Sequence, residues 1–319
     1  MSWIKLNNAV PVFLGLIMTL INGCDNSFDP RGPYQKRLAV YSILSNRSDT
    51  QYVRIYTTYN PSGFDPTENA SDTHVRNANV TLTDDSTTYR LRDTVVTRVD
   101  KSRYTDDLRG YVAYPCLLRV GKSYRLTVTS DQGNVQATVD VPGKGLLIPN
   151  NPFVLQAPDK YITEYITVTI QISPLTRGYV VRLYMDYDVK VGSEWVRRRE
   201  EIPTAVVSGS GTEVQYDYPR LTRRTSDINQ PNVNIHFPIA IYNSVFKRIV
   251  GQYGTDGFRL KSATYVLTQV EAGLYKYYNL ANGFQDQYSI RTDQPDFSNI
   301  QGGLGVFGAM TEDSVRVEF

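Results

Sequence analysis

Short runs rich in Val, Tyr, Thr and Leu follow one another from Leu38 to Val141, and their spacing limits the possible folds more than any other feature of the chain. Several runs alternate apolar and polar residues, the period of two that turns one face of a strand to the core. Seven strands at this spacing are typical of a Greek-key sandwich. The sequence therefore predicts a mainly β protein with an N-terminal immunoglobulin-like β-sandwich over residues 38–142. The runs are RLAVYSIL, QYVRIYTTY, NANVTLTD, TYRLRD, GYVAYPCLL, SYRLTVTSD and VQATVDVP.

One hairpin of this sandwich is predicted in detail, because two alternating runs flank the turn Asp-Gln-Gly-Asn at 131–134. Side chains two residues apart lie on the same face of a strand. We therefore expect three apolar residues from each strand to meet in the core: Tyr124, Leu126 and Val128 opposite Val135, Ala137 and Val139.

Proline and glycine residues from Pro142 to Pro152 interrupt the pattern and predict a domain boundary. Beyond it, β-like runs resume, among them YITVTIQIS, YVVRLYMDYDVKV, EWVRRREEIP and NVNIHFPIAIYNSVF. The sequence predicts a second β-rich domain over residues 143–319 with one packed α-helix near 269–282. Thr268 and Glu271 have the spacing of a capping box at the start of that helix.

The first residues have the layout of a secretory signal: an apolar run from Ala9 to Ile21, followed by Asn22, Gly23 and Cys24. The run is shorter than the roughly 20 apolar residues that a membrane-spanning helix needs. A small residue before a cysteine resembles the lipobox of bacterial lipoproteins, although Asn22 stands where a smaller residue is usual. We predict a signal peptide over 1–23, lipidation at Cys24 by acyl chains such as palmitate, and a flexible tether over 24–37.

The alternative is an ordinary signal peptide that happens to contain a cysteine. The chain has two cysteines, Cys24 and Cys116. If Cys24 carries lipid, Cys116 has no partner and is expected to be a small buried apolar residue. If it does not, a disulfide between the two becomes possible.

The composition and motifs disfavour several functions. Lys plus Arg (34) and Asp plus Glu (32) nearly cancel, so no nucleic-acid partner is expected. Gly303, Gly305 and Gly308 spell G-x-G-x-x-G, but the chain after them is too short for the helix, strand and acidic residue of a dinucleotide site. These glycines are expected to serve a turn, a bulge or a close backbone approach before the last strand, and no cofactor is predicted.

No metal site and no catalytic residues are predicted either. His74 and His236 are far apart and lack metal-ligand spacing, and no G-x-S-x-G motif occurs. Calcium remains an alternative at three acidic pairs that lie near expected turns or sheet edges, although no EF-hand spacing supports it. The pairs are Asp84 with Asp85, Asp106 with Asp107, and Glu200 with Glu201.

Tyrosine is unusually frequent, with 24 residues against 11 phenylalanines. Tyrosine suits half-buried strands, which is the simple explanation. It also suits interfaces, because it offers a large contact area with a polar tip. The candidate partner or ligand interface is Tyr52, Tyr56 and Tyr59, and a second cluster is Tyr275, Tyr277 and Tyr278.

Several stretches together resemble a family of Bacteroidota outer-membrane lipoproteins known as domain of unknown function 4249. They are Cys24 followed by FDP, the strands RLAVYSIL and NANVTLTD, VGKSYRLTVTSDQGNVQATVDVP, the YYNL helix and SNIQGGLGVFGA. The resemblance implies a β-rich protein anchored by lipid in the outer membrane, on a face that it does not specify. It also implies an association with TonB-dependent transporters.

The leading hypothesis is a non-enzymatic binding or accessory subunit that acts with an outer-membrane transporter of the TonB-dependent type. A secreted glycan-active hydrolase, with two carboxylates from distant strands, is a second hypothesis. A structural or adhesive surface protein is the third. Candidate partners are the membrane through the N-terminal lipid, the transporter, or a glycan.

Overall fold

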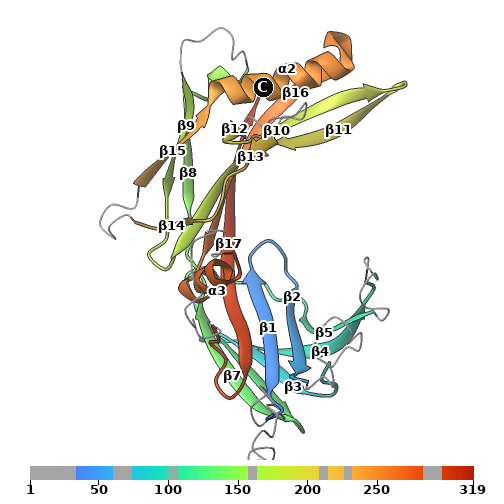
Figure 1. Cartoon of the computed structure of the whole chain (residues 1–319), viewed down its shortest axis with the longest axis vertical. Helices are drawn as coiled ribbons and strands as arrows, with labels where there is room; N and C mark the ends of the chain where they lie inside the picture. The colour runs from blue at the N-terminus through green and yellow to red at the C-terminus, as the bar shows by residue number, and fades with distance from the viewer. Residues whose placement is uncertain are drawn as a thin grey trace, which may run out of the picture. The chain divides into compact units, whose positions relative to one another are not determined.

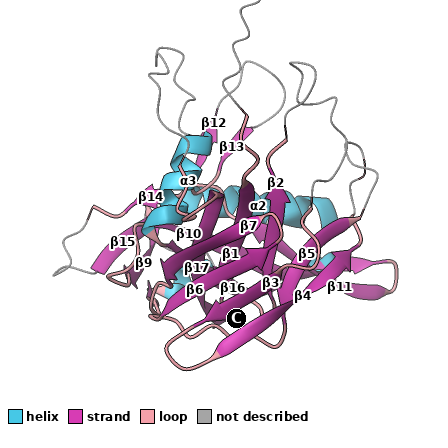
Figure 2. Cartoon of the chain, turned by 90° about the horizontal axis from the view of Figure 1, so that it is seen from below, coloured by secondary structure: helices cyan, strands magenta, loops and turns pink. Residues whose placement is uncertain are grey.

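The computed structural model describes residues 34–59, 74–98, 101, 107–156, 164–207, 215–225, 232–282 and 297–319. The protein is mainly β, which confirms the predicted fold class at that level (Figure 2). The strands form one sheet of 12, one of three and one of two. The predicted signal peptide, Cys24 and most of the predicted tether lie outside the described residues.

All seven strands predicted between residues 38 and 142 are present. They are β1 (Leu38–Ser45), β2 (Gln51–Thr57), β3 (Asn79–Thr83), β4 (Thr88–Val96), β5 (Leu108–Ala113), β6 (Ser123–Ser130) and β7 (Gly133–Asp140). Their order in the sheet is β1-β2-β5-β4-β3-β6-β7. The first part of β4 pairs with β3 and its second part with β5, so β4 joins two sections of the sheet. An immunoglobulin-like sandwich agrees with this order but stays a prediction.

The register of the β6–β7 hairpin is the predicted one. Leu126 lies opposite Ala137, with the pairs Tyr124–Val139 and Val128–Val135 on either side. All six side chains are buried in the core of this part of the chain. The alternation of apolar and polar residues was sufficient to predict this register, because only one face of the hairpin is apolar.

The remaining strands lie beyond residue 143. They are β8 (Leu146–Asn150), β9 (Tyr165–Gln171), β10 (Gly178–Val191), β11 (Glu194–Glu201), β12 (Ala205–Val207), β13 (Gln215–Asp217), β14 (Thr222–Arg223), β15 (Asn232–Pro238), β16 (Phe258–Val270) and β17 (Leu304–Glu318). Two short 3₁₀ helices are η2 (Pro152–Leu155) and η4 (Thr255–Gly257). A second apolar core contains Leu183, Met185 and Val189 of β10 together with Val168 of β9. The domain boundary at 142/143 stays a prediction.

The last strand, β17, belongs to both halves of the large sheet. Its first part, from Leu304 to Met310, pairs in parallel with β1. Its second part, from Met310 to Glu318, pairs antiparallel with β16. Figure 1 shows β17 running beside β1 and then continuing along β16. Phe307 and Ala309 are therefore part of the first core, while Val315 and Val317 pack against the second.

One helix was missed by the sequence analysis. The run NVNIHFPIAIYNSVF is a strand only as far as Pro238, and helix α2 covers Ile239–Tyr253. Its buried residues, Tyr242, Val245 and Ile249, recur at helical spacing. The β-branched residues concealed this spacing, because isoleucine and valine favour strands. Pro238 at the N-cap was the usable indication of a helix start.

Helix α3 covers Ala272–Asn282 and begins later than the predicted 269. The capping-box prediction is wrong, because Thr268 still belongs to β16 and pairs with Val180 and Glu312. Glu271 itself caps the helix, and its carboxylate accepts hydrogen bonds from the N–H groups of Gly273 and Leu274. Burial raises the pKa of Glu271, and these hydrogen bonds oppose that effect. No helix in the described part of the chain has the length and hydropathy to cross a bilayer.

Candidate partner-binding surface

A tyrosine- and arginine-rich surface lies on the outward face of β1 and β2. Alternate residues of β1 point to opposite faces of the sheet, so Val40 and Leu44 lie in the core while Tyr41 points outward and is 41% exposed. On β2 the same alternation buries Val53 and leaves Tyr52 52% exposed. Tyr41 lies directly opposite Arg54. Tyr52 is therefore a diagonal neighbour of Tyr41, within reach of long side chains.

Tyr56 lies on the same face of β2 but is less accessible. It is half-buried, and the edge of its ring meets the ring of His74, with 6.3 Å between centroids. The guanidinium carbon of Arg54 lies 4.9 Å from the centroid of Tyr56. Tyr59 is exposed beyond the end of β2. The structure thus brings two of the three predicted tyrosines to one face and places Tyr59 past the end of the strand.

Tyr41 completes this surface and was missed by the sequence analysis. The alternation of RLAVYSIL, with Leu38, Val40 and Leu44 pointing inward, could have identified it. The surface continues onto β5 and β4, because Tyr52 lies opposite Val112 and Val112 lies opposite Arg92. We call Tyr41, Tyr52, Arg54, Tyr56, Val112 and Arg92 the tyrosine surface. Tyrosine and arginine are enriched in protein interfaces and in their energetic centres.

The second tyrosine cluster is involved in packing. Tyr275 of α3 is buried, and its ring fills the space left by the missing side chain of Gly178. The rings of Tyr277 and Tyr278 are partly buried and meet edge to face, with 6.1 Å between centroids. These three tyrosines hold α3 against the sheet.

The two histidines lie far apart, because His74 forms an isolated β-bridge with Tyr56 and His236 belongs to β15. His74 is buried, its ring stacks on Tyr111 with 5.6 Å between centroids, and Nε2 lies 3.6 Å from the Asp93 carboxylate. His236 is exposed on β15. In the described ranges, no group of three or more His, Cys, Asp and Glu side chains has the arrangement of a metal site.

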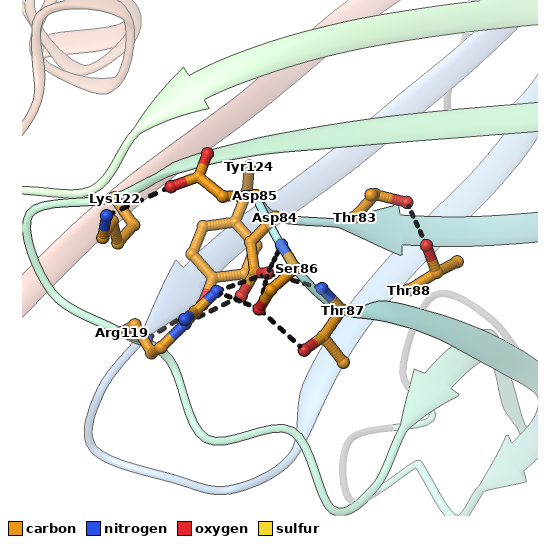
Figure 3. A network of polar contacts seen from close by, with 9 residues as sticks. All are labelled: Thr83, Asp84, Asp85, Ser86, Thr87, Thr88, Arg119, Lys122 and Tyr124. Atoms are coloured by element: carbon orange, nitrogen blue, oxygen red, sulfur yellow. Dashed lines mark hydrogen bonds and ion pairs between the residues drawn. The ribbon is translucent and has the colours of Figure 1, made fainter.

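The acidic pair Asp84 and Asp85 is held by basic side chains, as Figure 3 shows. The Asp84 carboxylate accepts hydrogen bonds from the amides of Ser86 and Thr87 at 2.9 and 2.8 Å, and from Nε of Arg119 at 3.0 Å. The hydrogen bond from Arg119, with those from the amides, lowers the pKa of Asp84, although burial opposes this. Lys122 pairs with Asp85 at 3.1 Å. Both carboxylates thus stabilise the β3–β4 turn.

The other acidic pairs give a similar result where they are described. Asp107 pairs with Lys101 at 3.0 Å, while Asp106 lies outside the described residues. Glu200 pairs with Arg248, and Glu201 pairs with Arg182 at 3.3 Å. Such pairs are structural, and they provide no support for the hydrolase hypothesis.

A row of charged and polar side chains, the charged ladder, crosses β11, β10 and β16 on the face of the sheet opposite the second core. Asp186 is buried and accepts hydrogen bonds from Arg199 at 2.6 Å and from Thr264 at 2.6 Å. Burial raises the pKa of Asp186, but its hydrogen bonds outweigh this effect and the net shift is downward. Arg197 pairs with Asp188 at 2.7 Å. The sequence VRRREE thus forms a strand whose charges are largely neutralised by its neighbours.

Cys116 is buried, as expected for a small apolar residue. Burial raises the pKa of its thiol to about 11. The thiol is thus protonated at neutral pH and unreactive. Cys24 lies outside the described residues, so both lipidation and the alternative disulfide stay predictions.

The G-x-G-x-x-G motif permits the close backbone approach expected from the sequence, but the last strand begins earlier than predicted, so Gly305 and Gly308 lie within β17. Gly305 has φ +111°, and a Cβ at this position would lie 2.0 Å from the carbonyl oxygen of Val40. Gly308 lies beneath Leu274 of α3. The glycines let β17 approach β1 on one side and α3 on another.

A family model described as "Domain of unknown function (DUF4249)" matches residues 25–316. No curated protein matches the chain. A similar solved structure is the C-terminal globular domain of an oligosaccharyltransferase from Pyrococcus abyssi, with a TM-score of 0.22 and 11% identity over 73% of this chain and 48% of that chain. The match thus spans about half the length of that chain, and a TM-score this low has no bearing on fold or function.

Proposed function

The chain belongs to the family known as domain of unknown function 4249, and from this premise we propose that it is a lipid-anchored protein of the cell envelope. In this proposal it is a non-enzymatic binding or accessory subunit that acts with an outer-membrane transporter of the TonB-dependent type. The lipobox-like stretch ending at Cys24 supports the anchor. The tyrosine surface supports the accessory role, and it is the single observation that carries the proposal.

The physical case depends on how the tyrosine surface is built. Its backbone is fixed by pairing with neighbouring strands on both sides, from β17 to β5. Tyr41 on β1 and Tyr52 on β2 are held by strands whose other faces are buried, so few backbone degrees of freedom are lost when a partner binds. Tyrosine has two side-chain torsions and a large contact area, which lowers the entropic cost further.

The test is crosslinking in intact cells, followed by affinity capture through a tag after Phe319 and identification of co-purified proteins by mass spectrometry. The wild-type chain is expected to capture an outer-membrane barrel protein in stoichiometric amount. The double variant Tyr41→Ala and Tyr52→Ala is expected to capture at least about tenfold less, because exposed aromatic anchors carry much of the energy of an interface.

The matched control is Tyr218→Ala, which removes a tyrosine of similar exposure, 44%, from a different part of the chain. It should capture the barrel as the wild type does. All three proteins should have the same thermal unfolding midpoint. Recovery of the lipoprotein alone, or equal capture by the double variant, would contradict the proposed function.

A further inference from the structure

The three-stranded sheet β15-β9-β8 has an outward face of unusual chemistry. Its inward face, with Val168, Ile170 and Phe237, is buried in the second core. The alternate positions point outward and include no Asp, Glu, Lys or Arg within these three described strands. They are Leu146, Ile148 and Asn150 of β8, Tyr165, Thr167, Thr169 and Gln171 of β9, and Asn232, Asn234, His236 and Pro238 of β15. We call this set the neutral face.

Hydrogen bonds arrange the polar members of the neutral face into rows across the strands. The hydroxyl of Thr169 donates to the amide oxygen of Asn234 at 2.8 Å and accepts from Nδ2 of Asn150 at 3.2 Å. The hydroxyl of Thr167 forms a hydrogen bond with Nδ1 of His236 at 3.0 Å. Each amide still has donor and acceptor capacity for a ligand after these bonds are made. The rows hold the side chains in place before anything binds.

Apolar groups flank these polar rows. Tyr165 is 50% exposed, and its ring meets the ring of His236 edge to face, with 5.7 Å between centroids. Leu146 and Ile148 are exposed along the β8 side. The neutral face is thus amphipathic, and it contains one half-exposed aromatic ring that can stack on an apolar face of a ligand. The charged ladder on β10, β11 and β16 of the same protein shows that its exposed sheet faces are not generally neutral.

We propose that the neutral face binds an uncharged, extended glycan. A sugar ring matches this chemistry, because it offers adjacent hydroxyls that both donate and accept, and an apolar face of C–H groups that stacks on an aromatic ring. A glycan lying along β9 would meet Tyr165, Thr167 and Thr169 in turn, because alternate residues of a strand lie about 7 Å apart on one face. A hexasaccharide is long enough to stack on Tyr165 and to bond to Thr169 at the same time. The outward positions of these three described strands include no Lys or Arg that could pair with an acidic glycan.

The test is calorimetric titration of the purified full chain with linear hexasaccharides of β-glucan, mannan, xylan and chitin. Hyaluronan and polygalacturonate oligosaccharides serve as charged comparators. At least one neutral hexasaccharide is expected to bind saturably, and the charged ones are not. Tyr165→Ala should weaken binding about tenfold through lost stacking. Thr169→Val keeps the shape of the side chain but removes its hydroxyl. It should weaken glycan binding about three- to tenfold, the equivalent of one hydrogen bond.

Tyr218→Ala is the control and should bind the glycan as the wild type does. Unchanged thermal unfolding midpoints would show that the variants are folded. The proposal is overturned if no neutral hexasaccharide binds or if only the charged ones bind. It is also overturned if the double variant Tyr165→Ala and Thr169→Val binds the glycan as tightly as the wild type. A photo-crosslinker at position 165 that captures a protein in cells, and no glycan, would also overturn it. The double variant Tyr41→Ala and Tyr52→Ala should bind the glycan normally, so this proposal and the proposed function can fail separately.

Discussion

Gly308 of β17 lies against Leu274 of α3 so closely that a Cβ at position 308 would be 2.9 Å from the Cβ of Leu274. Leu274 is buried and is the centre of the small cluster that joins α3 to the sheet. The closeness of this contact means that α3 is positioned by the absence of a side chain. A residue larger than glycine has to displace the helix.

Gly308→Ala is expected to lower the free energy of unfolding by about 1–3 kcal/mol, the usual cost of overpacking. Chemical denaturation measures it. The matched control is Gly251→Ala in α2, where a Cβ would meet nothing within 4 Å. Alanine is the better helix former there and should raise stability by about 1 kcal/mol. If both substitutions changed the free energy of unfolding equally, the contact between Gly308 and Leu274 would be too loose to position α3.

Gly305→Ala should be more damaging than Gly308→Ala. The residue has φ +111°, which side chains rarely adopt, and its Cβ would overlap the carbonyl oxygen of Val40. Strain and overlap together should cost more than about 3 kcal/mol. Hydrogen exchange should show loss of protection in the first part of β17 and in β1. Retained protection in both strands would contradict the predicted separation of β17 from β1.

Asp84→Asn should destabilise the protein at neutral pH, and the effect should disappear in acid. The pKa of Asp84 is lowered by Arg119 and by the amides of the turn. An unfolded aspartate titrates near about pH 3.9. The stabilisation from ionised Asp84 is therefore complete above that pH and is lost as the pH falls through the lower pKa of the folded state.

Urea denaturation at pH 7 and pH 3 tests this expectation. The Asp84→Asn variant should be about 1–2 kcal/mol less stable than the wild type at pH 7, and the difference should shrink at pH 3. Asp85→Asn is the neighbouring control. Its exposed pair with Lys122 should contribute within about 0.5 kcal/mol. If the Asp84→Asn variant were less stable than the wild type by the same amount at both pH values, the charge of Asp84 would not be the cause of the stabilisation.

Cys24→Ala tests the predicted lipid anchor. Because the thiol is the predicted site of acylation, the variant should lose metabolic labelling by a fatty acid and should fractionate with soluble protein. Cys116→Ala is the control, because that thiol is buried and protonated at neutral pH, and it should keep both label and membrane retention. Membrane retention of Cys24→Ala would refute the anchor.

Local patterns predicted the strands, and the reason is visible in the β6–β7 hairpin. Leu126 and Ala137 share one apolar face, and any shift by one residue would bury Arg125 and Thr138 instead. The same pattern predicted β1 and β2 as strands, and the outward position of Tyr52 agrees with the alternation in β2. The alternation in β1 could have identified Tyr41, whose neighbours Val40 and Leu44 point into the core.

Long-range pairing could not be predicted in this way. Val40 lies beside Gly305, and no local pattern indicates which distant strand will pair with β1 or in which direction. The start of α2 was missed for a different reason. Ile239 and Ile241 favour strands by their shape, but burial of Tyr242, Val245 and Ile249 on one side decides for a helix.

The shared strand β17 also determines the order in which the protein can fold. Synthesis produces β1 long before β17, so one edge of β1 stays unpaired until the last strand has been made. Contacts of such large sequence separation slow folding, and an open strand edge invites pairing with other chains. A chaperone that covers the open edge of β1 until β17 is available would therefore protect the chain from pairing with other chains while it folds.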